Sequence, residues 1–480
     1  MIGNTRAFMP LTTAALMLAL AGAPPAAASG FQLRDQSASG QGNAYAGIAA
    51  GGSDISSMFF NPAAMIRFDG NQIQVGLTEI LPSSKFSGSS ATRSNGSAIS
   101  GPLSTGNIAS SATLPIVYGM WSLSPDLKLG LSVNVPYGLT TDYDAGWAGR
   151  YHAVKSHLET LDIAPAVAWR LDPQWTVGAA FVARHAKADL SQGLDLGYTS
   201  QVEFSSIPGV THVIPSAGAA DGTADMTGSS WAYGYKLGLL YEPSSKLHIG
   251  FGYQSEVRET LRGTANFSYP ASTLGAGVQA WQAANPNQAA TIGRMATALL
   301  AQVANSSASA ELKLPAMFSL GASYDLSSTV TLSVEWDRTQ WHTFRELRIQ
   351  FANPGVQQDS VTTENWKDSN FFAVGATCHP DAKWTYRAGL ALDSTPVPDS
   401  TRTPRIPDAD RTWVSGGASY QFTKAFGMDA GYSHLFCKDS TVNLQAGSNP
   451  VTSNTYFQGN LTGTYKNSID VFSVQARYVF

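Results

Sequence analysis

An arginine on the inner face of an expected strand has the chemistry to bind an anion. Arg184, in "FVARHAKADL", has the same parity as Thr176 and Val182, whose side chains we expect to point inward. A guanidinium can hold a carboxylate through two parallel hydrogen bonds. Arg184 is therefore a candidate to bind an acidic ligand, although an ordinary charge facing a water-filled interior explains it equally well.

Catalytic and metal-binding patterns are much weaker. The eight histidines show neither HExxH nor another paired metal-ligand spacing. None belongs to a Ser or Cys pattern in which a base activates a nucleophile, and His434 in "GYSHLF" has the outward parity. We expect no catalytic residue, no metal site and no cofactor, and an enzyme remains only an alternative.

The elements that must position Arg184 belong to a protein with little water-facing surface. Of its 480 residues, 13% are charged, about half the roughly 25% of soluble domains. Mean hydropathy is nevertheless -0.08, which is too low for a bundle of membrane-spanning helices. Outer-membrane β-barrels combine both properties because lipid-facing and lumen-facing residues alternate along their strands. The net charge of -4 and the lack of a basic run exclude nucleic acid as a partner.

The N-terminus reads as an export signal. One cation, Arg6, precedes the apolar run from Ala14 to Ala21, and the small residues of 26–28 offer a cleavage site. We predict a signal peptide over residues 1–28. A membrane anchor is the alternative, but the run is short, and no other segment reaches the roughly 18 apolar residues of a transmembrane helix.

Period-two alternation recurs along the rest of the chain. In "KLHIGFGYQ", Leu247 and Phe251 share one face with the apolar residues between and after them. Such segments run to about ten residues, the length of a tilted membrane-spanning strand, and the connections between them alternate between short and long. We predict an all-β fold, a 14-stranded antiparallel transmembrane β-barrel over residues 71–480. Its strands are expected near 72–82, 112–122, 127–136, 156–170, 174–189, 228–242, 246–262, 311–325, 328–350, 367–378, 382–392, 411–422, 425–440 and 466–480.

Residues 29–70 do not follow the strand pattern. They are rich in Gly, Ala and Ser, and Asn61 can cap a helical turn that starts at Pro62. A barrel of this size is too wide for its own side chains to fill. Because apolar residues such as Phe59 and Phe60 need burial, we predict a small helical hatch that plugs the lumen. A disordered tail outside the barrel is the alternative.

The ordered motifs resemble one known family. They are "GFQL", "GNAYAG" and "DISSMFFNPAAM" in the hatch, the segments 135–171 and 396–420, and "YQSEV" at 253–257. Together they resemble the FadL-type outer-membrane transporters of long-chain fatty acids and other hydrophobic compounds, over essentially the whole mature chain. The last strand, "VFSVQARYVF", is similar to the signal read by the outer-membrane assembly machinery.

The resemblance implies a route and residues for it. Substrates are expected to enter through an apolar groove between the outer loops and to reach an interior site near Phe31. They are expected to leave sideways through a gap in the wall at Pro136, Tyr137 and Gly138, although this stretch could be an ordinary strand end. Family cations match Arg184 and Arg348 as substrate-binding residues. Strict alternation from Val330 places Arg348 on the outward face unless a bulge intervenes.

The function implied is passive uptake of long-chain fatty acids across the Gram-negative outer membrane. Uptake of aromatic hydrocarbons is the alternative, and a general porin or an outer-membrane hydrolase is less favoured. The partners expected are a hydrophobic small molecule, outer-membrane lipid with lipopolysaccharide, and the assembly machinery, for a monomeric protein. A separate apolar stripe through Ile292 and Leu299 predicts a helix in the loop 263–310, packed either against a substrate or over its own loop.

Overall fold

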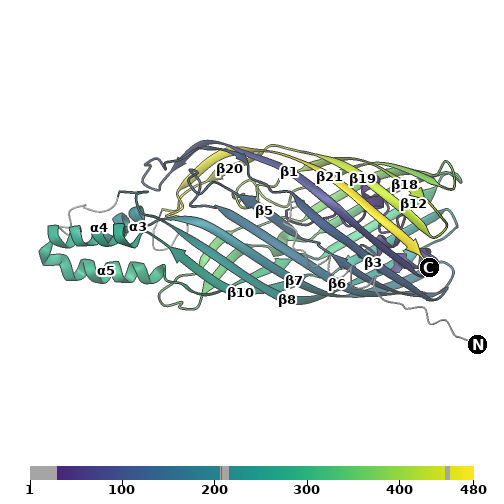
Figure 1. The fold of residues 1–480 in the computed structure, drawn as a ribbon, viewed down its shortest axis with the longest axis horizontal. Coiled ribbons are helices and arrows are strands. Elements are labelled where there is room, and N and C mark those ends of the chain that lie inside the picture. The colour runs from purple at the N-terminus through teal and green to yellow at the C-terminus, as the bar shows by residue number, and fades with distance from the viewer. Residues whose placement is uncertain (1–29, 206, 208–215, 449–454) are drawn as a thin grey trace, which may run out of the picture.

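The barrel is closed by a ring of strands that cross its wall. The computed structural model describes residues 30–205, 207, 216–448 and 455–480. Each pair of neighbouring wall strands is antiparallel, and β21 pairs with β1 to close the ring (Figure 1). The predicted fold class is confirmed. The 14 wall strands are β1 (Gln72–Thr92), β3 (Ala112–Ser124), β4 (Leu127–Asn134), β6 (Lys155–Arg170), β7 (Trp175–Asp195), β8 (Asp221–Tyr241), β9 (Leu247–Gln254), β12 (Met317–Asp325), β13 (Val330–Thr339), β16 (Ser369–Cys378), β17 (Trp384–Asp393), β18 (Arg411–Gln421), β19 (Phe426–Cys437) and β21 (Asn460–Val479).

Shorter strands extend this wall toward its outer end, and several expected strands are broken there. The segments predicted as single strands at 246–262, 311–325 and 328–350 are each interrupted. Pro315 lacks an N–H for the ladder, and a 3-10 turn, η4 (Trp341–Thr343), follows β13. The shorter strands are β2 (Ser104–Asn107), β5 (Gly138–Asp142), β10 (Val257–Ser268), β11 (Ser306–Leu314), β14 (Glu346–Phe351), β15 (Ser360–Thr363) and β20 (Ser440–Leu444).

Side chains alternate between the two faces of the wall. On β4, Leu129 and Leu131 are exposed on the outside, whereas Lys128 and Ser132 are buried inside. Apolar residues outside and polar residues inside are what a membrane-spanning barrel requires, since lipid covers its outer surface. None of the helices in the described residues is long and apolar enough to cross a membrane.

The hatch lies inside the barrel, toward the end that carries the C-terminus (Figure 1). It consists of α2 (Ala38–Gly42) and two 3-10 helices, η1 (Ile55–Phe59) and η2 (Pro62–Arg67), nearly all of whose residues are buried. Asn61 caps η2 by accepting the Ala63 N–H, and Pro62 occupies its first position. The segment that the sequence predicted to be helical and buried is therefore both.

Three helices project from the opposite end of the barrel (Figure 1). They are α3 (Leu196–Phe204), α4 (Ala271–Ala284) and α5 (Ala289–Gln302), with the short η3 (Pro286–Gln288) between the last two. Ile292 and Leu299 of α5 pack with Trp281 of α4 and Phe204 of α3. The predicted apolar stripe therefore packs into a small core of its own.

Candidate functional site

An apolar pocket lies in the outer half of the lumen, above the start of the hatch. It holds about 810 Å³ of empty space, part of it open to solvent. Strands β5 and β6 through β11 and β14 contribute to it, so its shape depends on how strands far apart in the sequence are brought together. Its mainly apolar lining includes Leu139, Leu158, Leu261, Leu312, Phe344 and Ile349.

Phe31, at the start of the hatch, forms part of the floor of this pocket. Its ring lies 4.8 Å from that of Trp341 and 5.5 Å from that of Trp366, measured between centroids. Phe344 at 6.0 Å and Tyr137 at 6.1 Å complete a box of four aromatic rings. Phe31 itself is 1% exposed. Edge-to-face packing at these separations stabilises the ring beyond its burial alone.

Gly30 fits the chain tightly against this aromatic box. Its φ of +68° is open to glycine at little cost. A Cβ at this position would lie 2.5 Å from a ring atom of Trp366. Its backbone N–H donates to Oδ2 of Asp408 at 2.7 Å. The start of the hatch is therefore held by a hydrogen bond to a loop carboxylate as well as by ring packing.

The hatch next pairs with an interrupted strand of the wall. β4 ends at Asn134 and β5 begins at Gly138. Leu33 donates its N–H to the carbonyl of Pro136 at 2.8 Å, and Gly138 donates to the carbonyl of Phe31 at 2.9 Å. The three predicted gate residues, Pro136, Tyr137 and Gly138, therefore lie where the hatch touches the wall.

The hydrogen-bonded pairing of neighbouring wall strands is interrupted where the start of the hatch contacts the wall. The register of β3 with β4 begins at Val117 opposite Val133, and the next bridge toward the outer end joins Ala109 to Thr141. The described strands show no ladder pair between 112–116 and the chain that runs from β4 into β5. Each edge of this wall interruption contains a proline, Pro115 or Pro136, which has no N–H to donate.

Arg184 lies on the inner face of β7, but an acid already neutralises it. Its Nε donates to Oδ1 of Asp162 at 2.6 Å, and its Nη2 donates to Oδ2 at 2.7 Å. Asp162 is its direct cross-strand partner on β6. The guanidinium also lies 4.8 Å from the ring centroid of Tyr137. Arg184 is absent from the pocket lining, so its predicted role in substrate binding stays a prediction that this geometry does not favour.

Arg348 lies on β14 and faces away from the pocket. Its neighbours Leu347 and Ile349 line the pocket, whereas the Arg348 side chain is 41% exposed. It pairs with Glu346 at 2.7 Å and with Asp359 at 3.0 Å. The turn at η4 interrupts the strand but does not bring Arg348 into the lumen, so a substrate-binding role for it is not supported here.

Two ionisable residues that the sequence patterns did not indicate do line the pocket. They are Glu364, between β15 and β16, and Arg405, in the connection from β17 to β18. Burial raises the pKa of Glu364 to about 8 and lowers the pKa of Arg405 to about 10. Period-two analysis has no access to such loop residues. The one available signal was an arginine within the motif "PRIPDADR".

The predicted hatch residues are fixed by contacts with the wall. The Nζ of Lys236 donates to the carbonyl of Phe59 at 2.8 Å and lies 3.5 Å from the centroid of its ring. Asn61 Nδ2 donates to the carbonyls of Ala49 at 2.7 Å and Leu239 at 3.0 Å. Both polar and apolar contacts therefore hold the hatch in place. Phe60 lies within the buried hatch cluster, and Pro62 abuts Gly178 and Gly238 of the wall.

Gly178 shows how closely the hatch approaches the wall. A Cβ on this residue would lie 2.3 Å from the backbone nitrogen of Ala63. A larger side chain there would have to displace η2. Small residues on the inner face of the wall therefore determine where the hatch can dock.

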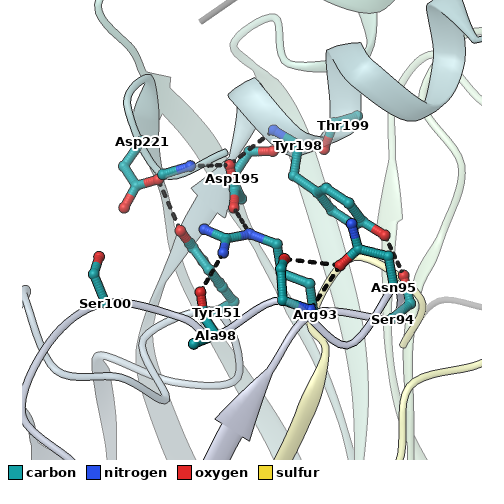
Figure 2. Close-up of polar contacts among 12 residues, drawn as sticks. Arg93, Ser94, Asn95, Ala98, Ser100, Tyr151, Asp195, Tyr198, Thr199 and Asp221 are labelled. Atoms are coloured by element: carbon teal, nitrogen blue, oxygen red, sulfur yellow. Dashed lines mark hydrogen bonds and ion pairs between the residues drawn. The ribbon is translucent and has the colours of Figure 1, made fainter. Parts of the chain in front are cut away.

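A polar cluster at the outer rim holds α3 against the neighbouring loops (Figure 2). Arg93, which directly follows β1, pairs with Asp195 at 2.7 Å, and Arg150 pairs with Asp221 at 2.8 Å. Asp195 also caps α3 by accepting the N–H of Tyr198 at 2.9 Å. Opposite charges that are mostly buried therefore hold these loops together.

A second pocket, on the other side of the hatch, is polar. It contains about 1240 Å³ of empty space, part of it open to solvent. Arg67, Arg387 and Arg477 contribute basic groups, and Asp325 and Asp381 contribute acids. Such a lining does not suit an apolar solute. The hatch therefore separates an apolar outer pocket from a polar chamber at the end with the short turns.

These features together define a class of protein. A closed barrel with lipid-facing strands, an internal hatch and an apolar pocket beside a wall interruption is an outer-membrane channel for hydrophobic small molecules. Comparison with known proteins gives the family. The family described as "Outer membrane protein transport protein (OMPP1/FadL/TodX)" matches residues 19–480, and the chain belongs to it. This match confirms the resemblance predicted from the motifs. The members of the family are transporters and not enzymes.

Individual relatives cover almost the whole chain. A long-chain fatty acid transport protein of Salmonella typhi is 30% identical over 416 residues, covering 86% of this chain and 89% of its own. The crystal structure of a Pseudomonas aeruginosa FadL homologue has a TM-score of 0.80 at 26% identity, covering 94% and 100%. The P. putida toluene transporter TodX has a TM-score of 0.62 at 16% identity, covering 88% and 94%. This last likeness concerns the fold alone.

Proposed function

We propose that the protein takes up long-chain fatty acids passively and releases them sideways through the wall interruption at 135–137. The observation that carries the proposal is that pocket, hatch and wall interruption meet at one level of the barrel. Phe31 lines the pocket and accepts a hydrogen bond from Gly138 beyond the interruption. A ligand in the pocket lies against the hatch residues that cover the exit.

The driving force follows from the chemistry of the pocket. Each CH₂ group that leaves water contributes about 0.8 kcal/mol, so a long acyl chain partitions into apolar walls without energy coupling. A wide, water-filled pore would offer such a chain no advantage. Movement is then downhill, from the outer loops to the pocket and from the pocket into the membrane.

The hatch must change for release to occur. Residues 31–33 pair with the interrupted strand, and Phe31 fills the aromatic box. Withdrawal of this short segment would open a path from the pocket to the interruption, while η1 and η2 keep the lumen plugged. We infer a local movement at the start of the hatch, without expulsion of the whole plug.

Similarity to the Salmonella typhi relative, which is named a long-chain fatty acid transport protein, favours a fatty acid as the substrate. One observation favours aromatic hydrocarbons as the second candidate, namely the four-ring box around Phe31. A benzenoid substrate could make the same edge-to-face contacts. Four expectations stay predictions: the monomeric state, contact with lipopolysaccharide, delivery by the assembly machinery, and the division into signal peptide, hatch and barrel. The predicted signal peptide, residues 1–28, lies outside the described residues.

The test is uptake of labelled oleate and labelled toluene by a strain that lacks its own transporter and carries this gene. We expect oleate uptake above that of the empty strain. Preference for toluene would favour the second candidate. Rapid uptake of small sugars by liposomes containing the intact protein would contradict both and indicate a general porin.

A further inference from the structure

The lining of the apolar pocket includes one arginine, Arg405. The strand pattern in the sequence did not indicate this residue. Arg405 lines the pocket beside Ile406, on the connection between β17 and β18. It is 7% exposed, so its charge is largely withdrawn from water. Glu364 and His157 are the other titratable side chains in the same lining.

The hydrogen bonds of the Arg405 guanidinium go to uncharged groups. Nη1 donates to the carbonyls of Lys155 at 3.1 Å and Ser191 at 3.4 Å, and to the hydroxyl of Ser156 at 3.2 Å. Nη2 donates to Oε1 of Gln192 at 3.0 Å. These contacts fix the orientation of the guanidinium and leave its positive charge uncompensated.

Other buried arginines nearby have their own counter-ions. Arg184 pairs with Asp162, and Arg411 pairs with Asp408. In the described part of the chain no acid lies within ion-pair distance of Arg405, which distinguishes it from these two. A buried charge without a partner is unfavourable, because the surroundings solvate it poorly. Arg405 therefore presents a charge that an anionic ligand could neutralise.

Glu364 does not supply that counter-ion at neutral pH. Its Oε2 accepts the Nε1–H of Trp366 at 2.8 Å. Because burial raises the pKa of Glu364 to about 8, most of this carboxyl is protonated at pH 7. His152 also lies close enough to Arg405 to feel its charge, and burial lowers the pKa of His152 to about 4, so it is neutral. Among the described residues, the pocket therefore combines apolar walls with a buried guanidinium that has no ion-pair partner.

We propose that Arg405 binds the carboxylate of the substrate, while the hydrocarbon tail occupies the apolar part of the pocket toward Phe31. The ligand class is a long-chain carboxylic acid in its ionised form. This inference rests on the proposed function and deepens it, because it names the residue that selects an acid over a neutral hydrocarbon. It places the head group at the outer loops, away from the neutralised Arg184.

The experiment compares oleate with methyl oleate, which has the same tail but no charge. Binding of each is measured on the purified full-length protein in lipid nanodiscs, for wild type and for Arg405→Gln, Arg405→Lys and Arg348→Gln. The Arg348 variant is the matched control, because that guanidinium is exposed and paired with two acids. Resistance of the unheated protein to SDS reports that each barrel is folded.

We expect wild type to prefer oleate, and Arg405→Gln to lose about ten- to hundredfold in oleate affinity, the range for a charge-assisted hydrogen bond. Methyl oleate binding should be unchanged, and Arg405→Lys and Arg348→Gln should keep the preference. Equal loss of both ligands in Arg405→Gln would overturn the proposal, as would an unchanged preference.

Wild type alone also tests the proposal, should Arg405→Gln fail to fold. If wild type binds methyl oleate as tightly as oleate, no cation selects the head group and the inference fails while the proposed function stands. If wild type binds neither ligand, the proposed function itself fails. The two failures are therefore distinguishable.

Discussion

Gly138 donates its backbone N–H to the carbonyl of Phe31 at 2.9 Å, so the start of the hatch completes a wall strand from inside the barrel. Together with the bond from Leu33 to Pro136, this places Gln32 directly opposite Tyr137. The two bonds flank this pair, which is the non-hydrogen-bonded arrangement in which side chains lie closest. The plug and the interrupted strand therefore act as one unit.

A disulfide between these two positions should lock the exit. In the double variant Gln32→Cys with Tyr137→Cys, the Cβ atoms should lie about 4.5–5.5 Å apart, within reach of a bond after small adjustment. We expect the oxidised protein to take up almost no oleate and the reduced protein to recover. Each single variant under oxidising conditions is the control. Equal uptake before and after reduction would show that the hatch start need not move.

Phe31→Ala should loosen the aromatic box. Removing a buried phenyl ring usually costs about 3–5 kcal/mol, and the space left would admit water next to Trp341 and Trp366. We expect red-shifted tryptophan emission and stronger quenching by acrylamide than in wild type. Phe31→Leu, which keeps much of the volume, is the control and should change less. Identical quenching in all three proteins would mean that the box is not closed by Phe31.

Pro62→Gly combined with Phe59→Ala should weaken the plug. The first change removes the residue that starts η2, and the second removes the ring that Lys236 contacts. We expect a higher single-channel conductance or faster leak of small solutes in planar bilayers. Pro286→Gly with Phe436→Ala alters a similar turn and a lipid-facing ring, so it serves as control. Unchanged conductance in the first variant would mean that this stretch is a connector only.

Arg184 and Asp162 should behave as a structural pair. Removing one partner of a buried ion pair typically costs about 3–5 kcal/mol, because the other charge is left uncompensated. Arg184→Ala should therefore lower the unfolding temperature of the barrel, whereas Arg184→Gln with Asp162→Asn should recover much of it. We expect the double variant to take up oleate at nearly the wild-type rate. A specific loss of oleate uptake in a stable double variant would return the carboxylate role to Arg184.

Oleate binding should weaken as pH rises through about 8, the raised pKa of Glu364. Below this pH the carboxyl is protonated and leaves Arg405 free. Above it the carboxylate competes for Arg405, whose pKa of about 10 keeps it charged. His157, in the same lining, and Tyr143, whose pKa is raised by burial, are the other titratable groups to consider. Glu364→Gln should abolish the dependence, and methyl oleate should show none in either protein.

Protonation of Glu364 also affects the stability of the folded protein. The pKa of Glu364 is raised in the folded protein. The contribution of this carboxyl to the free energy of unfolding is therefore fully present below its ordinary pKa of 4.5. That contribution is lost as pH rises toward about 8. Glu364→Gln should therefore flatten the decline in unfolding temperature between these two values. A parallel decline in wild type and variant would contradict the buried, protonated state of this carboxyl.

Much of the wall could be predicted because its pattern is local. Alternation in "KLHIGFGYQ" determined which residues face lipid, and Asn61 with Pro62 marked the turn that starts η2. The strand breaks near Ser255 and after Thr339 were missed. The alternation of apolar and polar residues can continue on both sides of a strand break, so periodicity alone cannot detect the break.

The sequence by itself determined the class of fold, the buried hatch and the inward parity of Arg184, since each follows from composition or from neighbours along the chain. Only the tertiary structure decided which charges are available to a ligand. Asp162 lies 22 residues from Arg184 and becomes its partner through strand register. Arg405 reaches the pocket from a loop after ring closure brings distant strands together. Charge compensation depends on distance in space, and one-dimensional spacing does not contain that distance.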